Sequence, residues 1–179
     1  MRAGQAEGAK LYQQSLVDLN AGAASIVLMP AGETMMDLAL QEANAAAARG
    51  EVPVGAVLVD PRSGEILART GNRVEELGDP TAHAEILAIR AGAAALGLKR
   101  LTDADLYVTL EPCAMCAAAI SFARLRRLYF GAGDPKSGAI EHGPRFFAQA
   151  TCHHRPEIYG GIGEAAAGEL LRAFFQARR

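Results

Sequence analysis

Hydrophobic residues along most of this chain alternate between helical spacing and short continuous runs, and the alternation predicts helices and strands in turn. Apolar residues recur with helical spacing over 36–47 and Gly50 ends the stretch, so a first helix is predicted there. The apolar run over 52–59 ends at Asp60-Pro61 and is typical of a buried strand. Residues 65–70 follow a turn and are predicted to be its hairpin partner.

Further elements follow the hairpin in a regular order. They are a helix over 82–96 closed by Gly97, a strand over 106–110, a helix over 116–123, a strand over 127–131, a weak strand at 158–159 and a final helix over 164–178. This order predicts the α/β fold class, a three-layer α/β/α arrangement with a mixed central sheet. Ligands in such sheets usually bind where strands end and the next helices begin.

The first 34 residues differ from the rest, because they are rich in Ala and Gly and lack sustained periodicity. We interpret residues 1–34 as a loosely ordered N-terminal extension, with a short helix over 9–19 as the alternative. The chain has 179 residues, half of them apolar, and is long enough to bury the core of one compact domain. That single domain is predicted to span residues 35–179.

The chemistry is concentrated in two short motifs, His83-Ala84-Glu85 and Pro112-Cys113-Ala114-Met115-Cys116. One imidazole and two thiolates would make three zinc ligands and leave a fourth position open for water, whereas a structural site normally has four protein ligands. A carboxylate beside an open site indicates hydrolysis. This H-x-E…P-C-x-x-C pattern is the described signature of zinc-dependent nucleobase deaminases.

Local geometry supports the ligand set. Pro112 suits the first position of a helix, and Cys113 and Cys116 would then lie on one face of its first turn, where the helix dipole favours thiolates. His83 and Glu85 would diverge along the side of a helix, so they can converge only beyond its N-terminal end. In that case the Ala84 N–H would be free and would point into the pocket.

Other uses of these residues fit less well. A C-x-x-C motif alone could be a redox dithiol or half of a zinc knuckle. The remaining cysteine, Cys152, has no second C-x-x-C around it, and a redox dithiol would not explain the preceding His-x-Glu. Cys152-His153-His154 could form a second metal cluster, but three adjacent ligands seldom share one ion, so an ordinary turn is expected.

Cellular location is indicated only indirectly. Three cysteines, two of them proposed ligands, do not form a disulfide framework, which favours a reducing cytoplasm. No apolar run approaches the ~20 residues needed to cross a membrane. Residues 21–31 have the length of a signal-peptide core, but the basic residues before them are scattered and distant. A cytoplasmic protein without membrane contact or organic cofactor is expected.

From about Glu51 onward the chain resembles the bacterial tRNA-specific adenosine deaminases, which have the cytidine deaminase-like fold. The stretches that carry the resemblance are residues 51–57, 71–73, 79–86, 107–116, 131–138 and the pair Phe174-Phe175. The zinc motif alone fixes only the superfamily, and the surrounding stretches narrow it to the tRNA enzymes. The chain departs from the pattern over residues 139–147 and ends without a long basic tail.

The resemblance implies conversion of adenosine to inosine at the wobble position of a tRNA anticodon loop, by a homodimer. It implies that zinc is held by His83, Cys113 and Cys116 and that Glu85 carries the proton. Substrate contacts are implied for Asn72, Ala84, Glu51, Asp134 and Lys136.

Charge gives weaker support, since the net charge of −2 is not typical of a nucleic-acid binder. Residues 120–179 carry nine Lys or Arg against five Asp or Glu, which predicts a basic patch or simply a solvated helix face. Two alternatives stay open. A deaminase of free guanine, cytosine or a nucleoside would need no RNA contacts, and a non-catalytic zinc module would have no use for Glu85.

Overall fold

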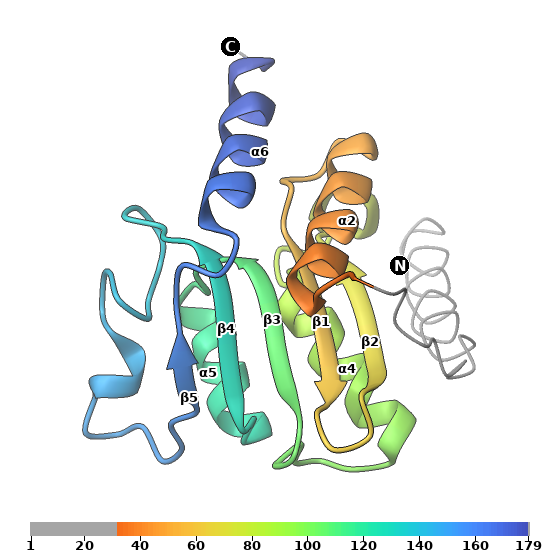
Figure 1. The fold of residues 1–179 in the computed structure, drawn as a ribbon. Helices are drawn as coiled ribbons and strands as arrows, with labels where there is room; N and C mark the ends of the chain where they lie inside the picture. The colour runs from red at the N-terminus through yellow and green to blue at the C-terminus, as the bar shows by residue number, and fades with distance from the viewer. Residues whose placement is uncertain (1–31, 179) are drawn as a thin grey trace, which may run out of the picture.

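The computed structural model describes residues 32–178 and consists of one five-stranded sheet with helices on both faces (Figure 1). The elements in chain order are α2 (Met35–Ala48), β1 (Gly55–Asp60), β2 (Glu65–Gly71), α3 (Val74–Leu77), α4 (Ala84–Leu96), β3 (Asp105–Leu110), α5 (Ala114–Ala123), β4 (Arg127–Ala132), the short 3₁₀ helix η1 (Phe146–Ala148), β5 (Glu157–Tyr159) and α6 (Glu164–Gln176).

The strands lie in the order β2-β1-β3-β4-β5. β1 is antiparallel to both neighbours, whereas β3, β4 and β5 run parallel to one another, so the sheet is mixed as predicted. α2 and α6 cover one face, and α4 and α5 pack on the other (Figure 1). The ends of β3 and β4 therefore lie beside the N-termini of helices on the second face.

The core follows the predicted apolar pattern. Leu58, Leu106 and Leu128 on neighbouring strands are fully buried on the face that carries α4 and α5. On the other face, α2 packs Met36 and Leu38 against the sheet, in a smaller cluster. Alternate side chains along each strand therefore point to opposite faces of the sheet, and each face packs against its own layer of helices.

The first strand begins three residues later than predicted. Pro53 has no N–H to give to a neighbouring strand, and the Val54 N–H is bonded to the carbonyl of Val52. The ladder starts at Gly55, where a Cβ would come within 2.1 Å of the Ala39 carbonyl oxygen of α2. Residues 52–54 are left outside the sheet, and Val52 lines a pocket instead. Sequence periodicity did not predict α3 or η1, which are short.

Residues 1–31 lie outside the described residues, and so does the alternative helix over 9–19. The prediction of a loosely ordered extension over 1–34 therefore stays a prediction, although Thr34 at its end is the N-cap of α2. No helix in the described part of the chain combines the length and the apolar character that crossing a membrane requires.

Candidate metal and active site

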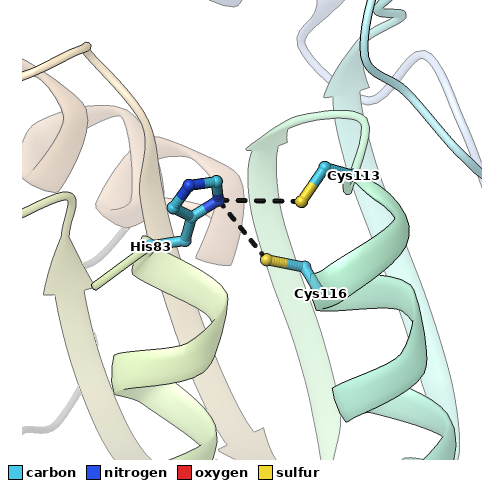
Figure 2. Close-up of side chains that lie close together, drawn as sticks. All are labelled: His83, Cys113 and Cys116. Carbon is cyan, nitrogen blue, oxygen red and sulfur yellow. Dashed lines mark hydrogen bonds between the residues drawn. The ribbon is translucent and has the colours of Figure 1, made fainter. Parts of the chain in front are cut away.

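Two helix N-termini meet at the ends of the central strands. His83 is the N-cap of α4 and Cys113 is the N-cap of α5, with Cys116 in the first turn of α5. His83 Nδ1 lies 3.7 Å from the Cys113 sulfur and 3.5 Å from the Cys116 sulfur (Figure 2). The two motifs therefore converge beyond the helix ends, as predicted.

The start of each helix differs in detail from the prediction. Pro112 is not the first residue of α5, which begins at Ala114. Cys113 is extended and forms a β-bridge with Gly138, and the Pro112 carbonyl accepts the Ala139 N–H. α4 likewise begins at Ala84, two residues later than predicted. The dipole argument still holds, since both cysteines lie at the N-terminal end of α5.

The three donor atoms fit a tetrahedral zinc ion. Usual zinc–nitrogen and zinc–sulfur bond lengths place a nitrogen and a sulfur ligand about 3.6 Å apart at the tetrahedral angle. The two nitrogen–sulfur distances agree with that value, and all three donor atoms lie within 4.8 Å of one another. An imidazole with two thiols is also the soft donor set that zinc prefers.

The thiols influence each other's ionisation. The hydrogen bond from Cys116 lowers the pKa of Cys113 to about 4, while the same bond and burial raise the pKa of Cys116. The Cys113 sulfur also raises the pKa of His83. One negative charge is therefore already favoured here, and a divalent cation would favour ionisation of both thiols.

Glu85 lies in the first turn of α4 with its side chain directed into the protein, and the residue is only 3% exposed. Its Oε2 atom is buried and has no hydrogen-bond partner among the described residues. Burial raises the pKa of Glu85. A buried carboxyl oxygen without a partner is costly in a purely structural role, so this atom is suited to a bound water or substrate.

The Ala84 N–H is not free, which corrects the prediction from sequence. The Asn72 side-chain oxygen accepts it at 2.9 Å. Because that bond fixes the orientation of the amide, the Asn72 Nδ2 group is the part left to donate to a ligand. The sequence could not predict this contact, because the two residues belong to separate turns that only the fold brings together.

A cavity of about 650 Å³ adjoins these residues. Of the predicted site residues, Glu51, Asn72, His83, Glu85, Cys113 and Asp134 line it. Lys136 is not part of the lining, although its neighbour Ser137 is. Four further residues line the cavity that were not predicted from the sequence to do so: Glu111, Phe174, Phe175 and Arg178.

Two of the lining residues, Glu51 and Glu111, have buried carboxylates that accept hydrogen bonds from backbone N–H groups. Glu51 accepts the N–H groups of Glu75 and Glu76 at 3.2 and 2.9 Å, and it thereby caps α3. Glu111 accepts four backbone N–H groups, and these bonds outweigh burial and lower its pKa to about 2. An acidic residue directly before Pro112-Cys113, at the end of a buried strand, was the available sequence signal.

Comparison with known proteins identifies the family. Residues 29–132 match the family described as "Cytidine and deoxycytidylate deaminase zinc-binding region". A tRNA-specific adenosine deaminase of Agrobacterium fabrum is 62% identical over 144 residues, which cover 80% of this chain and 93% of that protein. The chain belongs to the tRNA-specific adenosine deaminase family.

Solved structures agree with membership of this deaminase family. One, from a study of A-to-I editing by tRNA:A34 deaminases at the wobble position of transfer RNA, shares 62% identity with a TM-score of 0.74 and covers 76% of this chain and 98% of its own. A guanine deaminase from Bacillus subtilis is more distant, with 33% identity, a TM-score of 0.54 and coverage of 69% and 88%. The predicted cytidine deaminase-like fold is confirmed.

Cys152 and His154 of the cluster Cys152-His153-His154 have hydrogen-bond partners of their own, and none of the three belongs to the group that could hold a metal. Ser121 Oγ and the Cys152 thiol both donate to the His154 carbonyl, and the His154 ring is bonded to the Leu125 carbonyl. Within residues 32–178, the one group of side chains placed to hold a metal is His83, Cys113 and Cys116. A turn is present at residues 150–151, just before the cluster, whereas Cys152-His153-His154 themselves have no regular structure rather than the expected turn.

Proposed function

We propose that this chain hydrolyses adenosine to inosine at the wobble position of a tRNA anticodon, with zinc as its cofactor. The observation that carries the proposal is the open His/Cys/Cys donor set beside a buried carboxylate oxygen that has no partner. A structural metal site would have a fourth protein ligand and no need for that carboxylate. Family membership supports the same reaction.

His83, Cys113 and Cys116 would hold the zinc ion. When bound, zinc supplies a strong Lewis acid that lowers the pKa of water toward neutral values. The N-terminal ends of α4 and α5 stabilise the negative charge of the thiolates at this position.

Glu85 does the proton work in this proposal. Its carboxylate takes a proton from the water molecule that attacks C6 of adenine, and delivers it to the ring nitrogen N1. Glu85 then takes the second proton of that water, from the hydroxyl group now on C6, and gives it to the 6-amino group. The C6–nitrogen bond breaks, ammonia leaves, and the oxygen stays on C6 as the carbonyl of inosine. The raised pKa of Glu85 suits both halves of this task, because a general acid–base group works best near the operating pH.

The remaining site residues divide into two groups. Asn72 would donate its Nδ2 group to the flipped nucleotide, since its Oδ1 atom is already bonded to Ala84. Glu51 and Asp134 are proposed to shape opposite parts of the cavity wall, and Lys136 is exposed and free to approach a phosphate. The contact proposed for the Ala84 backbone would require its N–H to be shared with Asn72.

Deamination of a free base is the alternative. The cavity argues for a larger substrate, because it extends from the proposed metal ligands to Phe175 on α6 and to Arg178 just after that helix. Phe175 is 49% exposed and can offer a ring face to a neighbouring base. A target nucleotide must leave its stack to reach Glu85, and an anticodon loop makes that less costly than a duplex.

We further propose a homodimer, a single catalytic domain over residues 35–179 and a cytoplasmic location. The surface of α5 supports the dimer, because Phe122 is 78% exposed there. The location follows from the proposed tRNA substrate.

The deciding experiment compares an anticodon stem-loop that carries a wobble adenosine with free adenosine, cytidine and guanine. We expect inosine formation on the stem-loop to be far faster, and binding to weaken as salt rises, with a slope of about −0.7 per phosphate contact. Lys136→Ala should flatten that slope, and Arg62→Ala, on the β1–β2 turn, is the control that should not. Equal or faster turnover of a free base or nucleoside, without salt dependence, would contradict the tRNA assignment.

A further inference from the structure

Glu111 lies between the end of β3 and the first cysteine of the candidate metal site, and its carboxylate joins two distant points of the loop that follows β4. Oε2 accepts the Asp134 N–H at 2.9 Å, and Oε1 accepts the successive N–H groups of residues 140, 141 and 142 at 2.9, 2.8 and 3.0 Å. The His142 ring lies 2.6 Å from Oε2 through Nδ1. One side chain therefore holds both ends of the segment 134–142.

The fit between carboxylate and loop is tight. A Cβ at Gly138 would come within 2.5 Å of the Glu111 carboxyl carbon, so the loop can close over this side chain only with glycine there. The Glu111 side chain is fully buried, and no Lys or Arg of the described residues pairs with it. Its negative charge is stabilised by the backbone N–H dipoles and by the contact with the His142 ring.

The held segment forms a wall of the cavity. Asp134 and Ser137 line the cavity, and Asp134 Oδ1 accepts the N–H groups of Lys136 and Ser137 at 2.9 and 3.1 Å. The same segment contacts the start of α5, through the β-bridge between Gly138 and Cys113. The bonds of Glu111 thus set where Asp134 and Lys136 stand relative to the metal ligands.

Glu111 has no capacity left for proton transfer. A carboxylate offers about four acceptor sites, and Glu111 already accepts from five donors. Glu85 differs because its Oε2 atom lacks a partner. The action of Glu111 on the reaction would therefore be indirect.

We propose that Glu111 is a positioning residue that fixes the substrate-recognition wall, residues 134–142, relative to the zinc ligands. This inference rests on the proposed function, because it assigns the wall to recognition of the RNA around the target adenosine. Loss of the carboxylate weakens recognition more than it slows the chemical step, since His83, Cys113, Cys116 and Glu85 keep their positions.

The test compares Glu111→Gln with Asp105→Asn. Glutamine keeps one oxygen acceptor but turns an NH₂ group toward donors, whichever way the amide is placed. We expect one zinc per chain, a KM for the stem-loop raised by about tenfold to a hundredfold and a smaller change in kcat. Asp105 is a matched control, since it is a buried carboxylate bonded to Arg126 at the other end of β3. Asp105→Asn should lower the melting temperature without raising KM.

Two further measurements separate positioning from general destabilisation. Amide hydrogen exchange of residues 134 and 140–142 should accelerate at least about tenfold in Glu111→Gln and not in Asp105→Asn. Lys136→Ala should weaken stem-loop binding in the wild type and have much less effect in the Glu111→Gln background, because the lysine is then no longer held in place. If Glu111→Gln fails to fold, His142→Phe takes its place as the test. This change keeps a ring but removes the His142 ring nitrogen that contacts the Glu111 carboxylate, and it should raise KM severalfold.

Wild-type KM and unchanged loop exchange in Glu111→Gln would overturn the inference, and so would an equal rise in KM in Asp105→Asn. A wild-type enzyme that does not act on the stem-loop would instead contradict the proposed function. In that case the exchange data still decide whether Glu111 holds the loop.

Discussion

Two buried glutamates near the metal ligands differ in one respect that decides their roles. Glu111 is surrounded by donors, whereas the Oε2 atom of Glu85 has no partner in the described part of the chain. Burial without hydrogen bonds costs free energy, and proteins usually retain such a group where a ligand completes it. The missing partner of Glu85 is therefore the observation that supports its proposed role as the proton carrier.

Replacing Glu85 by Gln should separate chemistry from metal binding. Glu85→Gln keeps the size of the side chain and leaves the three ligands unchanged, so zinc content and melting temperature should stay close to wild type. Inosine formation should fall by about 10²- to 10⁴-fold, since the amide cannot carry the proton. Turnover within tenfold of the wild type, measured on the stem-loop, would refute a proton-transfer role.

Cys116→Ala is the complementary change. Cys116 is buried in the first turn of α5, and its loss leaves two protein ligands for the metal. We expect metal analysis to show less than one tenth of the wild-type zinc, and the variant to be less stable because structural order depends on the bound ion. Full zinc occupancy would show that these three residues are not the ligand set.

At the scale of elements, the start of α2 shows how local sequence fixes a boundary. Thr34 Oγ1 accepts the Asp37 N–H, and Asp37 accepts the Thr34 N–H at 2.8 Å, which completes a capping box. The Thr34 N–H and the Thr34 hydroxyl both donate to the Asp37 carboxylate. These two bonds, the backbone bond first, lower the pKa of Asp37 below its ordinary value of 3.8. α2 in turn packs across β1, β2 and β3.

The capping box makes a pH-dependent prediction. Because the folded pKa of Asp37 is lowered, its contribution to stability is fully present above pH 3.8 and is lost as pH falls through the folded pKa. Asp37→Asn should therefore lower the urea midpoint by a constant amount from pH 5 to 8 and approach the wild type in more acidic solution. A difference that grows as pH falls from 5 to 3 would have the wrong sign.

Across the whole molecule, the basic residues of the C-terminal third do not form one patch. Arg126 and Arg127 stand at the beginning of β4, paired with Asp105 and Glu157, whereas the cavity lies beyond its end. A six-residue strand separates the two ends by about 17 Å. Arg178 does reach the cavity, but it donates to the Gly50 carbonyl and lies over the Phe174 ring.

Phe122, a large apolar side chain exposed on α5, predicts self-association. Phe122→Asp should shift the mass measured by light scattering from dimer toward monomer, because it places a charge at the centre of the proposed contact. Ile162→Asp is the control, since Ile162 is also exposed but lies two residues before α6, and α6 covers the other face of the sheet from α5 (Figure 1). An unchanged mass in Phe122→Asp, or a shift in both variants, would place the contact elsewhere.

The sequence by itself determined the order of elements and the candidate metal ligands. Apolar spacing located all five strands and the four longer helices to within a few residues, since burial of alternating or helical faces is encoded locally. The pair of motifs likewise predicted the ligands, because His-x-Glu and C-x-x-C each need only one helix turn.

Only the tertiary structure decided the contacts that shape the substrate site. The bond between Asn72 and Ala84 joins two turns, and the bonds of Glu111 join the end of β3 to a loop more than twenty residues later. The exclusion of Pro112 from α5 likewise depended on distant residues, because Ala139 bonds to the Pro112 carbonyl and Gly138 forms a β-bridge with Cys113. Such hydrogen bonds satisfy buried polar groups across long separations in sequence, and no periodic pattern within one element carries that information.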